Sequence, residues 1–252
     1  MPITTLQIPT RDGRADAFAA YPDDGEPHPG VLMYMDAFGL RPVLREMAAE
    51  LAAHGYYVLV PNVLYRHGPA PVIELPEFIS AEHRPELIEK LIPLVVAYTV
   101  DQIKSDADAF LDFLGSRSEV SGGPVGVTGY CIGGMLAMRT AATHADRVAA
   151  VAGFHGGPLV TDDPDSPHRS FSRIKAEVLL GNADGDMTPE VFAELNEALN
   201  AAGVEYTSEI YPGAAHGFTM ADTEAFSPDG LRRHWDDLLP LLDRALKGHG
   251  TA

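Results

Sequence analysis

Residues 125–134, with the sequence VGVTGYCIGG, constrain the fold of this chain more than any other stretch. The β-branched residues at its start predict a short buried strand, and the residues that follow, MLAMRTAA, favour a helix. Between strand and helix the backbone must turn sharply, and Gly129 and Gly133 leave room for that turn. We therefore expect a tight corner at the carboxyl edge of a sheet, with the side chain of Cys131 projecting from its tip.

Cys131 has two interpretations, one structural and one chemical. It is the one cysteine among the 252 residues, and a lone Cys is often a small buried hydrophobic residue. At this corner, however, the thiol would lie at the start of a helix, where partial positive charge favours the thiolate. The spacing G-x-C-x-G between a strand and a helix is that of a nucleophile elbow with Cys in place of Ser. We therefore interpret Cys131 as a candidate nucleophile.

Length, charge and cysteine content limit the class of protein. A chain of this length can form one large core, and we expect residues 1–252 to be a single α/β domain. The net charge of −18 argues against nucleic acid or an anionic membrane as a partner. A single Cys excludes an internal disulfide, residues 1–6 do not resemble a signal peptide, and no apolar run reaches membrane-spanning length. We therefore expect a cytoplasmic protein, either a monomer or a small homo-oligomer.

Strand-like and helix-like stretches alternate along the sequence. After a hairpin over residues 4–21, strands are predicted near residues 30–35, 56–60, 125–130, 147–154, 177–181 and 204–211. Helices are predicted near residues 43–54, over 82–115 with interruptions, after the elbow to about 144, and near 189–202 and 231–247. This alternation predicts a mostly parallel sheet with helices on both faces.

Reactive side chains follow several of the predicted strands, where the chemistry of such sheets collects. They are Asp36, Cys131, Asp184 together with Asp186, and His216. A nucleophile, then an acid, then a histidine is the chain order of the α/β-hydrolase triad. We therefore predict the α/β-hydrolase fold.

Each member of such a triad has a defined task. His216 can accept the proton of the thiol and later deliver it to the leaving group. An acid behind it would fix the tautomer of the ring and stabilise the imidazolium. We assign the acid to Asp184, in a Gly-x-x-Asp turn. Asp186 is the alternative, but its position at the approach to the helix at Pro189 favours a turn or capping residue.

Several stretches together resemble the dienelactone hydrolase family. They are GYCIGG at 129–134, GNAD at 181–184, GAAHGF at 213–218, DAFGL at 36–40 and VPNVLYR at 60–66. The resemblance covers nearly the whole chain and implies hydrolysis of lactone or ester bonds through a thioester on Cys131, with Asp184 and His216. It also implies an oxyanion hole formed by the backbone N–H groups of Ile132 and Ala37.

The chain departs from this family at two positions. Asp36 stands where the family commonly has a Glu that engages the resting thiol, so we expect Asp36 to modulate Cys131. Met220 stands four residues after His216, where the family prototype has an Arg for the substrate carboxylate. We therefore expect a preference for neutral lactones and esters, unless Arg66, Arg84 or Arg169 supplies a cation. The candidates for substrate contact are Tyr65, Arg66, Tyr130, His155, Phe218 and Met220.

Other classes of function are the alternatives to this interpretation. A glutamine amidotransferase would carry an acid two residues after its catalytic His, but Phe218 occupies that position. The ten His residues show no ligand-like spacing, so we expect no metal, and we expect no cofactor. A nonenzymatic or regulatory binding protein on the same fold remains open, because a fold does not determine a function. A carboxylesterase or thioesterase with a different acyl substrate remains open as well.

Overall fold

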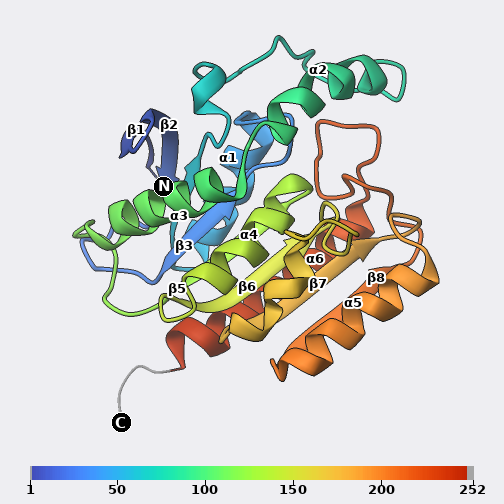
Figure 1. Cartoon of the computed structure of the whole chain (residues 1–252). Helices are drawn as coiled ribbons and strands as arrows, with labels where there is room; N and C mark the ends of the chain where they lie inside the picture. Colours follow the sequence, from blue (N-terminus) through green and yellow to red (C-terminus); the bar gives the residue numbers. More distant parts are fainter. Residues whose placement is uncertain (1, 249–252) are drawn as a thin grey trace.

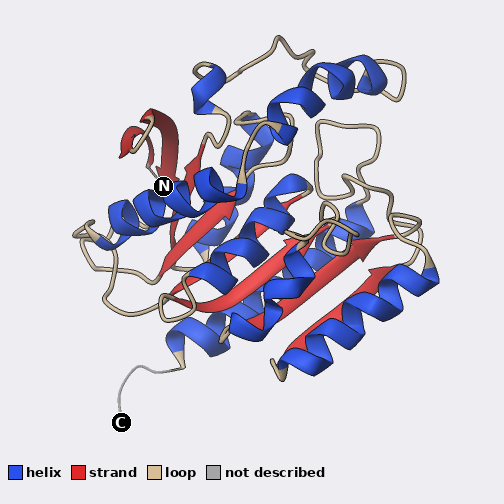
Figure 2. Ribbon diagram, viewed as in Figure 1, coloured by secondary structure: helices blue, strands red, loops and turns tan. Residues whose placement is uncertain are grey.

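The computed structural model describes residues 2–248 and contains a sheet with helices on both of its faces (Figures 1 and 2). The strands are β1 (Ile3–Thr10), β2 (Gly13–Ala20), β3 (Gly30–Tyr34), β4 (Tyr57–Pro61), β5 (Val125–Tyr130), β6 (Val148–Phe154), β7 (Glu177–Ala183) and β8 (Tyr206–Tyr211). They lie in the order β1-β2-β4-β3-β5-β6-β7-β8. The pairs β1–β2 and β2–β4 are antiparallel and all other neighbours are parallel. The predicted mostly parallel sheet is therefore confirmed.

The helices agree with the predicted pattern, except that one predicted helical region is divided in two; one strand is also longer than predicted. They are α1 (Pro42–Ala53), α2 (Arg84–Val96), α3 (Val100–Gly115), α4 (Ile132–Thr143), α5 (Pro189–Ala202) and α6 (Pro228–Leu242), with short helical turns at Tyr65–His67, Pro167–Arg173 and Asp243–Lys247. The predicted helical region 82–115 divides into α2 and α3, because Thr99 forms a capping box with Gln102 and starts a new helix. The strand predicted to end at residue 181 continues to Ala183.

The central strands of the sheet bring the loops with the reactive side chains together at one edge. Every residue of β3, β4 and β5 is buried, as expected for central strands covered on both faces. The polar loops that follow these parallel strands therefore emerge together at their carboxyl ends, and α2 lies over this edge (Figure 1). Within residues 2–248, the structure contains no helix that is long and apolar enough to cross a membrane.

Candidate active site

Cys131 lies between β5 and α4 in a strained backbone conformation, with φ 53° and ψ −120°. A non-glycine residue with positive φ is uncommon and persists only where its surroundings enforce it. Glycines enforce it here: a Cβ on Gly129 would lie 2.0 Å from the carbonyl oxygen of Gly133. A Cβ on Gly133 would lie 2.5 Å from the carbonyl oxygen of Met35. The chain therefore forms the predicted strand–turn–helix corner, with the thiol at its tip.

His216 lies in the loop after β8 and is hydrogen-bonded to Asp186. The distance from Nδ1 to Asp186 Oδ2 is 2.6 Å. The side chain of His216 is 30% exposed and that of Asp186 is 18% exposed, so the pair is only partly screened by water. This ring nitrogen donates to the carboxylate, and Nε2 remains for the thiol of Cys131. The predicted pairing of His216 with Asp184 is therefore wrong.

The length of β7 explains the error. Because the strand continues to Ala183, Asp184 directly follows its end and serves the turn itself. The backbone N–H of Asp184 donates to Ala214 O at 2.8 Å, and its carboxylate accepts from Gly213 N–H at 3.0 Å. Asp186 lies farther out and reaches the imidazole. It is not the cap of α5 either, because Thr188 accepts the hydrogen bond at that position.

The charge state of His216 follows from its neighbours. Burial opposes a charged ring, but hydrogen bonds to Asp186 and Cys131, together with their charges, raise the pKa of His216 to about 10. The ring is therefore an imidazolium at neutral pH.

Asp36 is held by a buried arginine. Its carboxylate, with the residue 3% exposed, accepts from Arg41 Nη1 at 2.5 Å, Arg41 Nη2 at 2.9 Å and Phe38 N–H at 3.1 Å. Arg41 also pairs with Asp222, at 2.6 Å from Nε. Burial opposes the charge of Arg41, but the two carboxylates raise its pKa above the ordinary value. Arg41 binds both oxygens of this carboxylate, while Asp36 also lines a small cavity with Cys131 and His216, so modulation of Cys131 by Asp36 stays a prediction.

The two candidates for the oxyanion hole lie next to the nucleophile. Ala37 lies in the loop after β3, Ile132 is the first residue of α4, and both line a cavity with Cys131. The volume of this cavity is about 680 Å³. Because both residues line one cavity with the thiol, their backbone N–H groups stay the candidates for binding a developing oxyanion. In the sequence, this pair was implied by the resemblance to the dienelactone hydrolase family.

Two of the proposed substrate contacts lie beside the nucleophile, in a second cavity of about 30 Å³ that is also lined by Cys131 and His216. Met220 is one of them. His155 is the other, but it is fully buried, with its ring centroid 5.2 Å from that of His216 and its Nε2 2.8 Å from Thr219 Oγ1. Burial, and then the charge of His216, lower the pKa of His155 well below its ordinary value, so the ring is neutral. We therefore assign His155 to supporting His216 rather than to touching substrate.

Four other candidates do not line either of these cavities. Tyr65 and Arg66 both donate to Asp106, and Arg66 also pairs with Asp12. Tyr130 is fully buried, with its hydroxyl 3.0 Å from His234 Nε2. The remaining candidate is Phe218, which is fully buried and packs edge-on against the ring of His155. These predicted contacts therefore fail, because the side chains belong to the core or to ion pairs elsewhere.

One arginine of the three considered from the sequence lies at the site. Arg84 donates from Nη2 to His216 O at 3.2 Å and lines the cavity of about 30 Å³. Arg169 instead donates to Asp163 O, and Arg66 is neutralised by two carboxylates. Residues 2–248 contain no group of three or more His, Cys, Asp or Glu side chains that could hold a metal ion.

A mostly parallel sheet with a nucleophile elbow after a central strand and a histidine after the last one defines the α/β-hydrolase fold. Comparison with known families narrows this class, since residues 15–246 match the model of the dienelactone hydrolase family. The chain belongs to the dienelactone hydrolase family. It is thus a carboxylic ester hydrolase of the dienelactone hydrolase type.

Individual relatives agree with this assignment. A Methylorubrum extorquens protein provisionally named a carboxymethylenebutenolidase is 30% identical over 240 residues, which cover 92% of this chain and 78% of the relative. A Bradyrhizobium protein provisionally named a 2-oxo-3-(5-oxofuran-2-ylidene)propanoate lactonase is 26% identical, over 88% of this chain and 86% of its own. A Klebsiella pneumoniae crystal structure provisionally titled a dienelactone hydrolase has a TM-score of 0.83 at 21% identity and covers 96% of this chain and 98% of its own. At that identity the structural likeness supports the fold alone.

Proposed function

We propose that this protein hydrolyses lactone or ester bonds by covalent catalysis at Cys131. The proposal assigns His216 as acid and base, Asp186 as the orienting acid, and the backbone N–H groups of Ala37 and Ile132 as the oxyanion hole. One observation carries it: His216 lies between the Asp186 carboxylate, at 2.6 Å, and the thiol at the tip of the elbow. Named activities of the relatives, a butenolidase and a lactonase, agree with this reaction class.

The first half-reaction forms a thioester. The thiolate sulfur of Cys131 attacks the carbonyl carbon, and the carbonyl oxygen becomes an oxyanion that accepts hydrogen bonds from the two backbone N–H groups. When this intermediate collapses, the carbon–oxygen bond to the leaving group breaks. His216 Nε2 donates its proton to the departing alkoxide, and Asp186 keeps the ring oriented for this transfer. For a lactone, the alcohol remains attached to the acyl group.

The second half-reaction returns the enzyme to its starting state. Neutral His216 now accepts a proton from a water molecule, whose oxygen attacks the thioester carbon. The carbon–sulfur bond then breaks and the carboxylic acid product leaves. The thiolate and the imidazolium are restored together, and this is the resting charge state that the raised pKa of His216 favours.

Hydrolysis of p-nitrophenyl acetate and of a simple lactone by wild type and Cys131→Ala tests this proposal. The variant should lose turnover and retain its circular dichroism spectrum, because the thiol is the attacking atom and contributes little to the core. Mass spectrometry of rapidly quenched wild type should find an acetyl group on Cys131. Full turnover in Cys131→Ala would exclude the thiol mechanism. An acetyl group on another residue would assign the nucleophile elsewhere.

The thiol also distinguishes an enzyme from a binding protein on the same fold. An elbow thiolate should react with iodoacetamide at neutral pH faster than free cysteine, and alkylation should abolish turnover in proportion. A binding protein would show the slow alkylation of an ordinary thiol and no turnover with any ester. His216→Gln provides the matched control, because it removes the cation beside the thiol and leaves the elbow in place.

A further inference from the structure

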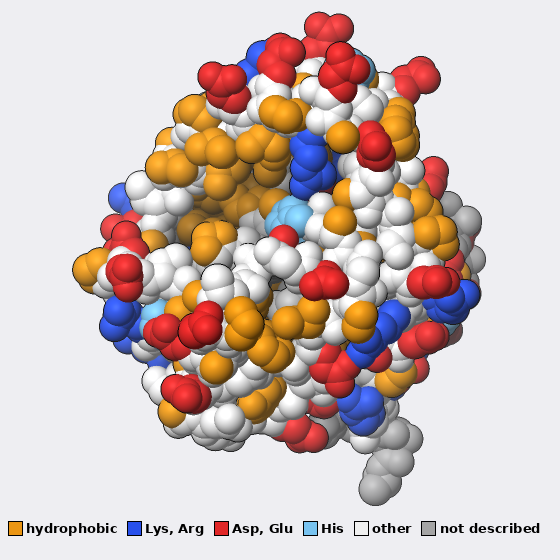
Figure 3. Space-filling view, turned by 90° about the vertical axis from the view of Figure 1, so that its right-hand side faces the viewer, with side chains coloured by type: hydrophobic (Ala, Val, Ile, Leu, Met, Phe, Trp, Pro, Cys, Tyr) orange, Lys and Arg blue, Asp and Glu red, His pale blue; other side chains and the backbone are white. Residues whose placement is uncertain are grey.

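The larger of the two cavities at Cys131 has a mostly apolar wall. Its volume is about 680 Å³, and it lies between α2, α3, α4 and the loop after β6. Hydrophobic residues of α2 and α4 form much of its lining: Ile88, Leu91, Ile92, Val95, Val96 and Met135. Figure 3 shows a hollow with a largely hydrophobic wall and a histidine side chain at its edge. A pocket of this size and lining is typical of sites for apolar small molecules.

The lining indicates which half of a substrate would occupy this cavity. Cys131, Ala37 and Ile132 line the large cavity, whereas His216 lines the small one together with Cys131. The leaving group must face His216, because the proton comes from that ring. The small cavity, of about 30 Å³, has room for only one or two water-sized groups. The acyl part therefore extends away from His216, into the large cavity.

The mouth of this cavity exposes apolar side chains that a bound ligand would cover. Ile92 is 53% exposed and Val96 is 76% exposed, and both line the cavity from α2. Exposed apolar surface gathered around a concave site is typical of a binding site rather than of ordinary protein surface. Continuity with the thiol of Cys131 identifies the occupant as substrate.

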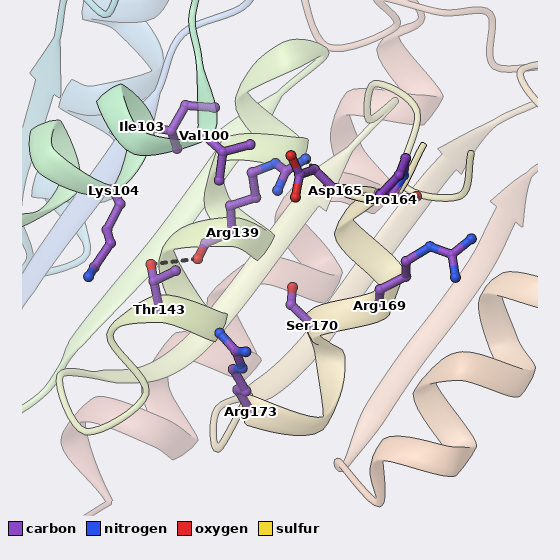
Figure 4. Close-up of a pocket in the computed structure, with 11 residues that line it drawn as sticks. Val100, Ile103, Lys104, Arg139, Thr143, Pro164, Asp165, Arg169, Ser170 and Arg173 are labelled. Atoms are coloured by element: carbon purple, nitrogen blue, oxygen red, sulfur yellow. Dashed lines mark hydrogen bonds between the residues drawn. The ribbon is translucent and has the colours of Figure 1, made fainter. Parts of the chain in front are cut away.

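At the far end, the wall becomes polar and carries a net negative charge, because Asp163 and Asp165 outnumber Arg139. Arg139 donates from Nη2 to Asp165 O at 2.5 Å, and the charges of Asp163 and Asp165 both act on it. Figure 4 shows Arg139 beside Asp165 in the lining of a third pocket, and Val100 and Ile103 line both this pocket and the large cavity. One cation between two carboxylates does not attract an anionic chain end. This wall limits the length of an apolar chain.

We propose that the preferred substrate carries an uncharged apolar acyl chain of medium length, which occupies the cavity between α2 and α4, with a small leaving group on the His216 side. The inference rests on the proposed function, since the acyl and leaving sides are defined by Cys131 and His216. Each methylene that enters the cavity should raise kcat/KM, because it leaves water for an apolar wall. Complete burial corresponds to about fourfold per methylene, or about 0.8 kcal/mol.

Two matched series of esters test which side of the substrate is recognised. In ethyl esters from acetate to dodecanoate, kcat/KM should rise by about two- to fourfold per methylene and then stop rising at the polar wall. In alkyl acetates from ethyl to dodecyl, kcat/KM should not rise, because the small cavity has no room for a longer alcohol. A flat acyl series in an enzyme that hydrolyses the acetate would overturn the inference, and so would a gain confined to the alcohol series.

A pair of variants locates the effect in the cavity. Ile92→Asp places a charge on the cavity wall and should remove most of the rise with acyl length. Phe78→Asp is the matched control, because Phe78 is 51% exposed, against 53% for Ile92, and lines neither cavity at Cys131. It should leave the rise unchanged. Equal loss in both variants would assign the effect to general surface charge and contradict the inference.

A binding measurement separates failure of this inference from failure of the proposed function. If no ester is turned over, the proposed function fails, and calorimetric titration with octanamide then decides the inference alone. Octanamide should bind wild type more tightly than butanamide, and Ile92→Asp should lose this difference whereas Phe78→Asp keeps it. Equal affinity of wild type for the two amides would show that the cavity does not hold an acyl chain.

Discussion

His216 connects the two charged partners of the site. One ring nitrogen donates to Asp186, and the ring also contacts Cys131, so the imidazolium lies between a carboxylate and the nucleophile. Beneath it, the buried and neutral ring of His155 packs edge-on, which fixes the plane of His216 without adding a second positive charge. The chemistry of the site at the scale of single residues therefore depends on the partner of this one ring.

Replacing each aspartate separately tests that partner. Asp186→Asn should lower kcat by roughly 10³- to 10⁴-fold, because the amide cannot stabilise the imidazolium and favours the wrong tautomer. Asp184→Asn should lower kcat far less, since the carboxylate of Asp184 accepts a hydrogen bond from Gly213 N–H in the turn and does not contact His216. Steady-state rates with one ester measure both variants. A greater loss in Asp184→Asn would contradict the assignment.

The same pair predicts a pH dependence. The raised pKa of about 10 keeps His216 protonated from pH 6 to 9, and Asp186→Asn should lower that pKa toward the ordinary value. Because the folded pKa lies above the unfolded value of about 6.5, the stability contributed by this proton is complete below pH 6.5 and is lost as the pH rises through about 10. Titration of the ring protons by NMR measures the value in both proteins. A pKa near 6.5 in wild type would contradict the ion pair.

The positions of Cys131 and His216 were predictable at this scale, and the aspartate that pairs with His216 was not. The glycines around Cys131 and the triad order carry a strong local signal in the sequence. The choice between Asp184 and Asp186 depends on where β7 ends, and strand ends are poorly marked when small residues such as Asn182 and Ala183 extend the strand. The ion pair of Asp36 was also missed, because its partners Arg41 and Asp222 come together only in the folded chain.

At the scale of elements, Arg41 joins two loops that carry the site. It is the residue before α1, and it binds Asp36 in the loop after β3 and Asp222 in the loop after His216. The first loop carries Ala37, a candidate for the oxyanion hole. A buried ion pair is not a strong source of net stability, but removing one partner leaves uncompensated charges behind.

Arg41→Gln should therefore lower the unfolding free energy by about 3 kcal/mol, because Asp36 and Asp222 lose their common cation. It should also lower kcat, since the loop that carries Ala37 loses its anchor. Arg45→Gln is the control from the same helix, where the guanidinium lies 4.5 Å from the centre of the Phe18 ring. Denaturant titration measures both variants, and equal losses would show that the network does not anchor the loops.

The order of the elements was largely predictable, and the position of α2 was not. Continuous apolar runs identify the central strands, and the amphipathic pattern identifies the helices. Residues 65–81 form an irregular connection before α2. The orientation of α2 relative to the sheet could therefore not be predicted from the sequence. The cavity depends on that orientation, which is why the apolar residues of α2 were predicted only as a helix and not as the wall of a binding site.

At the scale of the whole molecule, the net charge of −18 acts on any charged substrate before it reaches the site. An ester with an anionic acyl chain should be repelled at low ionic strength, so its kcat/KM should rise severalfold between about 10 mM and about 200 mM NaCl. A neutral ester of the same length should show no such change. If kcat/KM for the anionic ester instead falls as the salt concentration rises, the attraction by Arg84 at the site outweighs the repulsion by the net charge of the molecule.

The solitary thiol also has a consequence for oxidation. Peroxide acts on thiolates first and would convert Cys131 to a sulfenic acid. No second cysteine exists among these 252 residues to condense with that group, so the chain cannot protect itself by forming an internal disulfide. Repair then depends on an external thiol arriving before further oxidation makes the damage irreversible. The large cavity lined by Cys131 is thus also the route by which we expect both oxidant and reductant to reach the sulfur.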